Sequence, residues 1–234
     1  MTQAPGREGG PAGPGSDGVQ DLLGLLAYAE LVAFFRLSED AVLAPSLADK
    51  AALGGMAVAE FGHFKLLWDH LSALGARPEE AMLPFAAALD AFHARTAPSD
   101  WLEGLVKAYV GDAIAADFYR AVAELVDPQT RELVLQVLAD TGHAEFVVAR
   151  VRTAIEADPQ VGGRLALWAR RLVGEALAQA YRVVADRPSL ASLLSAGSHG
   201  EAGGPAAELG DVGRMFARIT DAHAARMAAL GLAN

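Results

Sequence analysis

The 234-residue sequence contains no cysteine. This absence excludes disulfides, thiolate nucleophiles, cysteine-ligated zinc and iron–sulfur clusters. Patterns typical of β-strands are nearly absent too, because apolar residues recur at helical spacing along the chain. No uninterrupted apolar run is long enough to cross a membrane, since Gln20, Asp21 and Glu30 interrupt the most apolar stretch, 19–35. Together these absences favour an all-α, cytoplasmic protein that does not bind a membrane.

Positive charge is scarce, and the formal net charge of −10 argues against non-specific nucleic-acid binding by the whole surface. The stretch 146–194 is an exception, because its arginines outnumber its acidic residues by seven to four. A solvated face on two adjacent helices explains this pattern, and a local nucleic-acid contact is the alternative. The candidate contacts for that alternative are Arg150, Arg152, Arg164, Arg170 and Arg171.

The organisation of the chain follows from its proline and glycine residues. Residues 1–18 are rich in both and lack the apolar segment of a signal peptide, so we expect a disordered arm. Residues 19–194 are expected to form one helical domain, 195–205 a flexible linker and 206–234 a segment with a C-terminal helix at 206–230. Within the domain, helix start and stop signals predict helices at 19–43, 47–74, 99–126, 128–157 and 159–187.

The lengths of the connections predict the topology. Short connections after residues 43 and 126 indicate two antiparallel hairpins, and Ser99 is the expected N-cap of the helix 99–126. The connection 76–98, with a short helical piece at 86–95, is longer than most helix–helix loops. A long segment between two hairpins is what a four-helix bundle needs when one connection crosses its full length.

Two short motifs repeat the same arrangement of residues. Glu60-Phe61-Gly62-His63 and Asp140-Thr141-Gly142-His143 each place an acidic residue three positions before a histidine. Residues i and i+3 share one face of a helix, so each pair directs an oxygen and a nitrogen at one point. Glu30 and Asp112 precede the two acidic residues by 30 and 28 positions, each on the preceding apolar helix.

These residues make up the ligand set of a dinuclear metal centre in a bundle core. Ionised carboxylates in an apolar core are costly unless they are neutralised, and two divalent cations would balance four of them. Oxygen and imidazole ligands suit iron or manganese. The predicted ligands are Glu30, Glu60, His63, Asp112, Asp140 and His143.

Other polar residues are weaker candidates. His70 and Glu175 could support the ligands from behind, whereas Asp117 lies about 140° around its helix from Asp112 and should not share the centre. His93, His199 and His223 are expected to be surface or structural residues. Glycines 62, 111 and 142 are expected to let the helices approach closely around the centre.

With these residues in place, the chain resembles the ferritin-like di-iron superfamily, and within it the tRNA isopentenyl-adenosine hydroxylase-like group, over residues 19–187. The resemblance implies two iron ions that activate O₂ when reduced by an external electron donor, with tRNA as a candidate partner. It also implies that Glu30 and Asp112 are terminal ligands, that Glu60 and Asp140 bridge, and that His63 and His143 bind one iron each. The family usually has glutamate at all four acidic positions, and aspartate at 112 and 140 shortens the reach of that half.

The leading functional hypothesis is an O₂-dependent di-iron monooxygenase that hydroxylates an unactivated C–H bond, with manganese as the alternative metal. A second hypothesis is a ferritin-like oxidase, peroxidase or iron-handling protein without hydroxylase activity. A third is a metal-free helical interaction module. We expect a monomer or small homo-oligomer, because the C-terminal extension does not suit a subunit of a simple storage shell.

Overall fold

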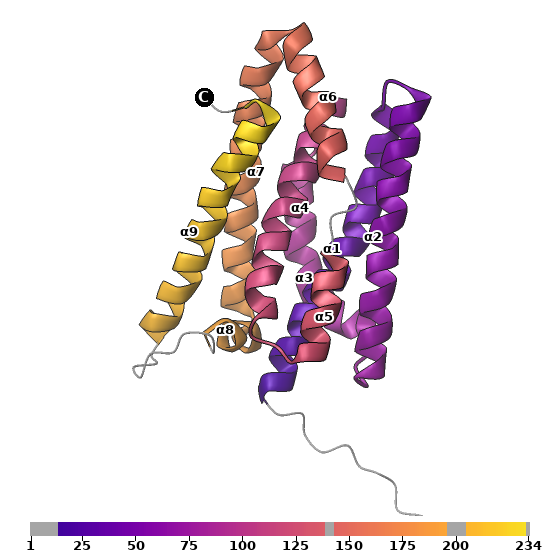
Figure 1. The fold of residues 1–234 in the computed structure, drawn as a ribbon. Helices are drawn as coiled ribbons and strands as arrows, with labels where there is room; N and C mark the ends of the chain where they lie inside the picture. Colours follow the sequence, from indigo (N-terminus) through magenta and orange to yellow (C-terminus); the bar gives the residue numbers. More distant parts are fainter. Residues whose placement is uncertain (1–13, 139–142, 196–204, 233–234) are drawn as a thin grey trace, which may run out of the picture.

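The computed structural model describes residues 14–138, 143–195 and 205–232, and that part of the chain forms an elongated bundle of helices without strands (Figure 1). The all-α prediction is therefore confirmed. The helices are α1 (Pro14–Leu43), α2 (Leu47–Ala73), α3 (Pro78–Arg95), α4 (Trp101–Ala123), α5 (Pro128–Val137), α6 (His143–Ala157), α7 (Pro159–Asp186), α8 (Pro188–Ser195) and α9 (Pro205–Leu230).

The first two helices form the predicted antiparallel hairpin (Figure 1). Ser46 caps α2, because its side-chain oxygen accepts a hydrogen bond from the backbone N–H of Asp49 at 3.1 Å. Along the hairpin, apolar residues of α1 pack in one core with Phe64, Leu67 and Leu71 of α2. The hairpin thus fixes which residues of the two helices lie opposite each other.

By length and composition, the Asp17–Leu43 stretch of α1 is the one candidate membrane span within the described residues. Three polar residues, Gln20, Asp21 and Glu30, interrupt this stretch. In the structure 56% of its most apolar window is buried inside the bundle, as expected of a helix that packs in a protein core.

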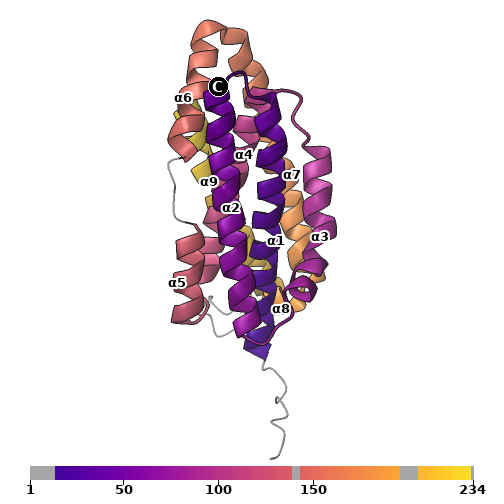
Figure 2. The same ribbon diagram turned by 90° about the vertical axis from the view of Figure 1, so that its right-hand side faces the viewer.

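Helix α3 is longer than the piece predicted at 86–95. It begins at Pro78, which suits the first turn of a helix, and it continues through Pro84. It packs beside α1 and α7 along one side of the molecule (Figure 2). The crossing with α1 is close, since a Cβ atom at Gly24 would overlap the carbonyl oxygen of Ala81.

The start of α4 differs by one residue from the prediction. Asp100, not Ser99, is the N-cap, and its carboxylate accepts a hydrogen bond from the Glu103 backbone N–H at 2.9 Å. Ser99 instead donates to the Glu103 carboxylate, at 2.8 Å from its backbone N–H and 2.6 Å from its hydroxyl. Glu103 therefore completes a reciprocal cap at this end of α4.

The predicted helix 128–157 is two helices in the structure. Asp127 caps α5, which ends at Val137, and α6 begins at His143. The two lie nearly end to end beside α4 (Figures 1 and 2). Residues 139–142, which include the predicted ligand Asp140, lie outside the described residues.

The C-terminal helices cover the remaining side of α4. Helix α7 begins behind its cap Asp158, as predicted, and α9 packs against α4, α6, α7 and α8. Helix α8 is not predicted from the sequence, although its first residue, Pro188, marks the expected end of α7. The prediction of a disordered arm is wrong for residues 14–18, which belong to α1. The rest of the expected arm and most of the linker fall on 1–13 and 196–204, outside the described residues.

We expect Gly24→Ala to destabilise the protein, because the new methyl group would force α1 and α3 apart at the Ala81 carbonyl. Overpacking of this kind costs about 1–3 kcal/mol. Gly55→Ala on α2 is the matched control, since a Cβ there meets no atom within 4 Å, and it should stabilise by about 0.5–1 kcal/mol. Urea unfolding followed by circular dichroism measures both, and equal effects would contradict the close crossing.

Candidate metal centre

The α1–α2 hairpin brings three predicted ligands together. Glu30 lies 13 residues before the end of α1 and Glu60 lies 13 residues after the start of α2, so the antiparallel helices place them opposite each other. His63 lies one turn after Glu60 and shares its face. Ligand atoms of the three residues all lie within 4.8 Å of one another, and the His63 Nδ1 atom is 3.4 Å from Oε2 of both glutamates.

The three side chains perturb one another strongly. Burial, and then the nearby Glu60, raise the pKa of Glu30 well above its usual range. Burial also acts to raise the pKa of Glu60, but contacts with Glu30 and His63 outweigh it and hold this pKa below its ordinary value. Hydrogen bonding to Glu30 and Glu60 raises the pKa of His63 to about 10.

The chemistry of this group fits a divalent cation. Glu30 Oε2 is buried, and its contact with His63 Nδ1 is long, at 3.4 Å, so a cation could readily replace this weak partner. Carboxylate oxygens and an imidazole nitrogen that converge on one point are a donor set for iron or manganese. The raised pKa values of Glu30 and His63 favour bound protons, which carry positive charge at the place where such a cation would carry it.

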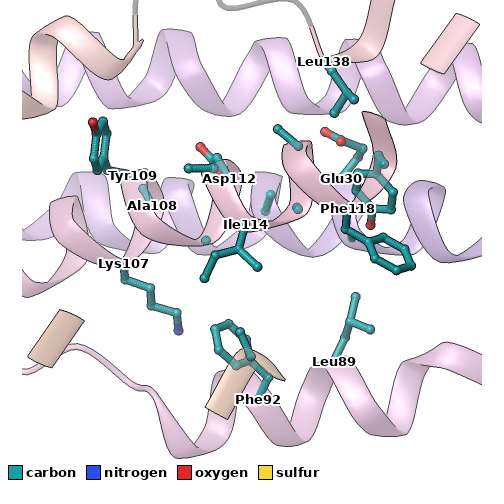
Figure 3. Close-up of a pocket in the computed structure, with 18 of the residues that line it drawn as sticks. Glu30, Leu89, Phe92, Lys107, Ala108, Tyr109, Asp112, Ile114, Phe118 and Leu138 are labelled. Carbon is teal, nitrogen blue, oxygen red and sulfur yellow. The ribbon is translucent and has the colours of Figure 1, made fainter. Parts of the chain in front are cut away.

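Two predicted ligands of the other hairpin face the same cavity. Asp112 of α4 lines this cavity, and Figure 3 shows its carboxylate on the same side of α4 as that of Glu30. Surrounding protein, and then the charge of Glu60, raise the pKa of Asp112 well above its usual range. His143, the first residue of α6, also lines the cavity, and its charge helps to lower the pKa of Glu60.

The cavity has a volume of about 540 Å³ and is mostly apolar. It extends on both sides of α4, with Tyr109 and Asp112 on one side and Lys107 on the other (Figure 3). Its size is that of a site for a small organic molecule. Glu30, Glu60, His63, Asp112 and His143 all line it, so any metal held there would border a space large enough for a substrate.

The structure does not bring the other sequence candidates to this group. Glu175 points toward α3, where its carboxylate lies 3.7 Å from Arg95, and neither Glu175 nor His70 lines the cavity. Asp117 does not line it either, as the helical period predicts. The expectation for glycines 62 and 111 is wrong, because a Cβ at either position meets no atom within 4 Å.

The arginines proposed as nucleic-acid contacts make contacts within the protein. Arg150 binds Asp49, and Arg164 binds both Asp100 and Glu103, each pair at 2.7 Å. Arg152 and Arg171 donate to backbone carbonyl oxygens, those of Ala229 and Arg95. Arg170 also has an interaction partner. These arginines therefore tie helices together, which explains much of the positive charge of this region.

A polar group that the sequence patterns do not indicate lies at one end of the cavity and includes Lys107, Asp40 and His93. Lys107 is buried and donates to the Thr96 carbonyl oxygen at 2.7 Å, and burial lowers its pKa to about 8. Burial raises the pKa of nearby Asp40. His93 lines the same end, and its Nδ1 has no hydrogen-bond partner among the described residues. The sequence signal that could have indicated this polar group is Lys107, a lysine in an apolar stretch five residues before Asp112.

Burial, and then the charge of Lys107, lower the pKa of His93 to about 3, so the folded protein keeps this ring neutral where an unfolded chain would protonate it. Between pH 6.5 and 3 the unfolded state therefore binds the extra proton, and His93 should contribute a loss of stability as pH falls. His93→Gln should remove this contribution. Unfolding free energies of both proteins at pH 7 and pH 4.5 measure it, and a constant difference between them would contradict the neutral buried ring.

Comparisons with known proteins agree with the observed fold. A solved structure described as "Protein 19 with aldehyde deformylating oxidase activity from Synechococcus" matches with a TM-score of 0.62 and 16% sequence identity, covering 94% of this chain and 92% of that chain. At this identity the likeness shows the fold alone. No curated protein matches the chain. Residues 15–197 match the family described as "Ferritin-like domain, actinomycetes". Because the match spans most of the sequence and the observed helices have that fold, the chain belongs to this family of ferritin-like domains.

Proposed function

We propose that the protein is an O₂-dependent di-iron oxidoreductase that acts on a small, mainly apolar substrate in the bundle cavity. The observation that carries this proposal is the group formed by Glu30, Glu60 and His63, whose ligand atoms lie within 4.8 Å of one another at the wall of an apolar cavity. The structural neighbour is described as having aldehyde deformylating oxidase activity, and an oxidase activity on this fold is consistent with the proposal.

The six predicted ligands divide into two sets, one for each proposed iron, and different observations support the two sets. Glu30, Glu60 and His63 would hold one iron, with Glu60 between the two halves. Asp112 and His143 line the cavity and interact electrostatically with Glu60, which supports their assignment to the second iron. Asp140 is assigned to that iron by the sequence motif alone. When reduced, a di-iron centre supplies the capacity to activate O₂.

The chain itself contributes binding and exclusion of water. The apolar walls include Leu89, Ile114 and Phe118, and they would orient an apolar group beside the carboxylates (Figure 3). Glu30 is 8% exposed, and burial raises its pKa, which supports a poorly solvated position for the proposed iron. A cavity of this kind favours oxidation of a substrate C–H bond or aldehyde over storage of iron.

We expect the purified protein, after anaerobic addition of Fe(II), to bind two iron ions per chain and to change its optical spectrum on exposure to O₂. His63→Ala and Glu60→Ala should each reduce the stoichiometry to one or fewer, because each removes a ligand from the group of three. His70→Ala, on the same helix but outside the cavity, is the matched control and should keep both ions. Elemental analysis with absorption spectroscopy measures this.

A wild-type protein that retains neither iron nor manganese would contradict the proposal and favour a metal-free interaction module. Gel filtration addresses the oligomeric state, for which we propose a monomer or small homo-oligomer; a large cage would favour iron storage.

Monooxygenation of a hypermodified tRNA adenosine is the narrower form of the proposal. It is supported by the sequence resemblance, whereas the arginines assigned to tRNA contacts are occupied within the protein. Under this form, a deletion strain should accumulate the unhydroxylated nucleoside. Mass spectrometry of total tRNA nucleosides compares deletion and complemented strains, and identical profiles would restrict the proposal to a small-molecule substrate.

A further inference from the structure

A second polar group lies on the side of the cavity formed by α4, α7 and α9. Arg226 of α9 donates through Nη2 to the Asp117 carboxylate of α4 at 2.5 Å. Arg120 of α4 lies 3.5 Å from the other oxygen of the same carboxylate. Both arginines line the cavity, whereas Asp117 does not. Asp117 follows Asp112 by five residues, a rise of about 7.5 Å along α4, so this group is distinct from the predicted metal ligands.

Two buried hydrogen-bond donors that line this cavity, one on α9 and one on α7, lack partners among the described residues. Arg226 Nη1 is buried and makes no hydrogen bond, although Nη2 of the same guanidinium is paired. Gln179 of α7 lines the cavity and is 5% exposed, and its Nε2 atom is also buried without a partner. Its Oε1 atom accepts from Arg182 Nη1 at 3.4 Å. Buried donors of this kind are costly when nothing accepts from them.

The local charge balance is positive. Two guanidinium groups share one carboxylate, which leaves one positive charge beside the cavity. His223, one turn before Arg226, does not alter this balance, because burial and the charge of Arg226 lower its pKa. The adjoining cavity walls, from Val183, Val184, Phe216 and Ile219, are apolar.

From these observations we infer that Arg226 and Gln179 bind the carboxylate head of a mainly apolar ligand, whose body lies along the apolar wall of the cavity. A carboxylate carries the single negative charge that balances the surplus, and it accepts from two donors at once. Under the proposed function this ligand is the substrate. The carboxylate would then anchor one end of the molecule, and the apolar part would lie along the cavity walls beside α7 and α9.

The test measures binding of decanoate, decanol and decyl phosphate to the metal-free protein by isothermal titration calorimetry. Decanoate should bind at least about tenfold more tightly than decanol, because only its carboxylate accepts charged hydrogen bonds. Decyl phosphate should bind more weakly than decanoate, since its second charge lacks a partner. Equal binding of decanoate and decanol, or tighter binding of the phosphate, would overturn the assignment.

Two substitutions locate the binding site. Arg226→Gln should weaken decanoate binding by at least about tenfold and leave decanol binding unchanged. Arg218→Gln is the matched control, because Arg218 is exposed on the same helix, and it should have no effect. Gln179→Glu replaces a donor with a negative charge and should abolish decanoate binding. This variant keeps the pair between Arg226 and Asp117, so it tests the site even where Arg226→Gln does not fold. Retention of decanoate binding by Gln179→Glu would overturn the inference.

A last variant separates this inference from the metal centre. Glu60→Gln should lose iron and keep decanoate binding, because the carboxylate head does not contact the ligand group. Loss of decanoate binding in Glu60→Gln would show that the head binds at the metal-ligand group, and would overturn the inference. A wild-type protein that binds decanoate but no iron would instead contradict only the proposed function.

Discussion

The structure depends on the cost of holding carboxylates in an apolar bundle. Glu30 and Glu60 lie opposite each other on a hairpin whose core residues are mainly apolar, and His63 lies 3.4 Å from both, where it can offset their charge. Hydrogen bonding to the two carboxylates raises the pKa of His63 to about 10, so a proton on this ring offsets part of their charge. A fold that keeps such residues together pays in stability for a capacity to bind something of opposite charge.

Much of the fold could be predicted from the sequence, because its signals are local. Proline, glycine and aspartate at helix ends placed α2, α7 and α9 within a residue or two. The spacing of Glu30 and Glu60 from the turn at residues 44–46 is enough to bring them together once the hairpin forms. These predictions need only helical periodicity and antiparallel packing, and both follow from neighbouring residues.

The remainder depends on contacts between distant residues. The sequence predicted only the piece 86–95 of α3, but packing of Ala81, Met82 and Phe85 keeps the helix continuous through Pro84. The roles of Arg164 and Arg150 could not be predicted, because their partners lie 61 and 101 residues away. For the same reason the placement of Gln179 and Arg226 on one cavity could not be predicted, because it depends on how α7 and α9 pack in the bundle.

The burial pattern of α4 has a mechanical consequence. Residues at both ends of the helix are buried, among them Leu105, Val106, Val122 and Ala123, whereas none of residues 111–117 is. The helix is therefore held by packing at both ends, whereas residues of its middle turns line the cavity. The middle of α4 is therefore the part of this helix that is expected to move most readily.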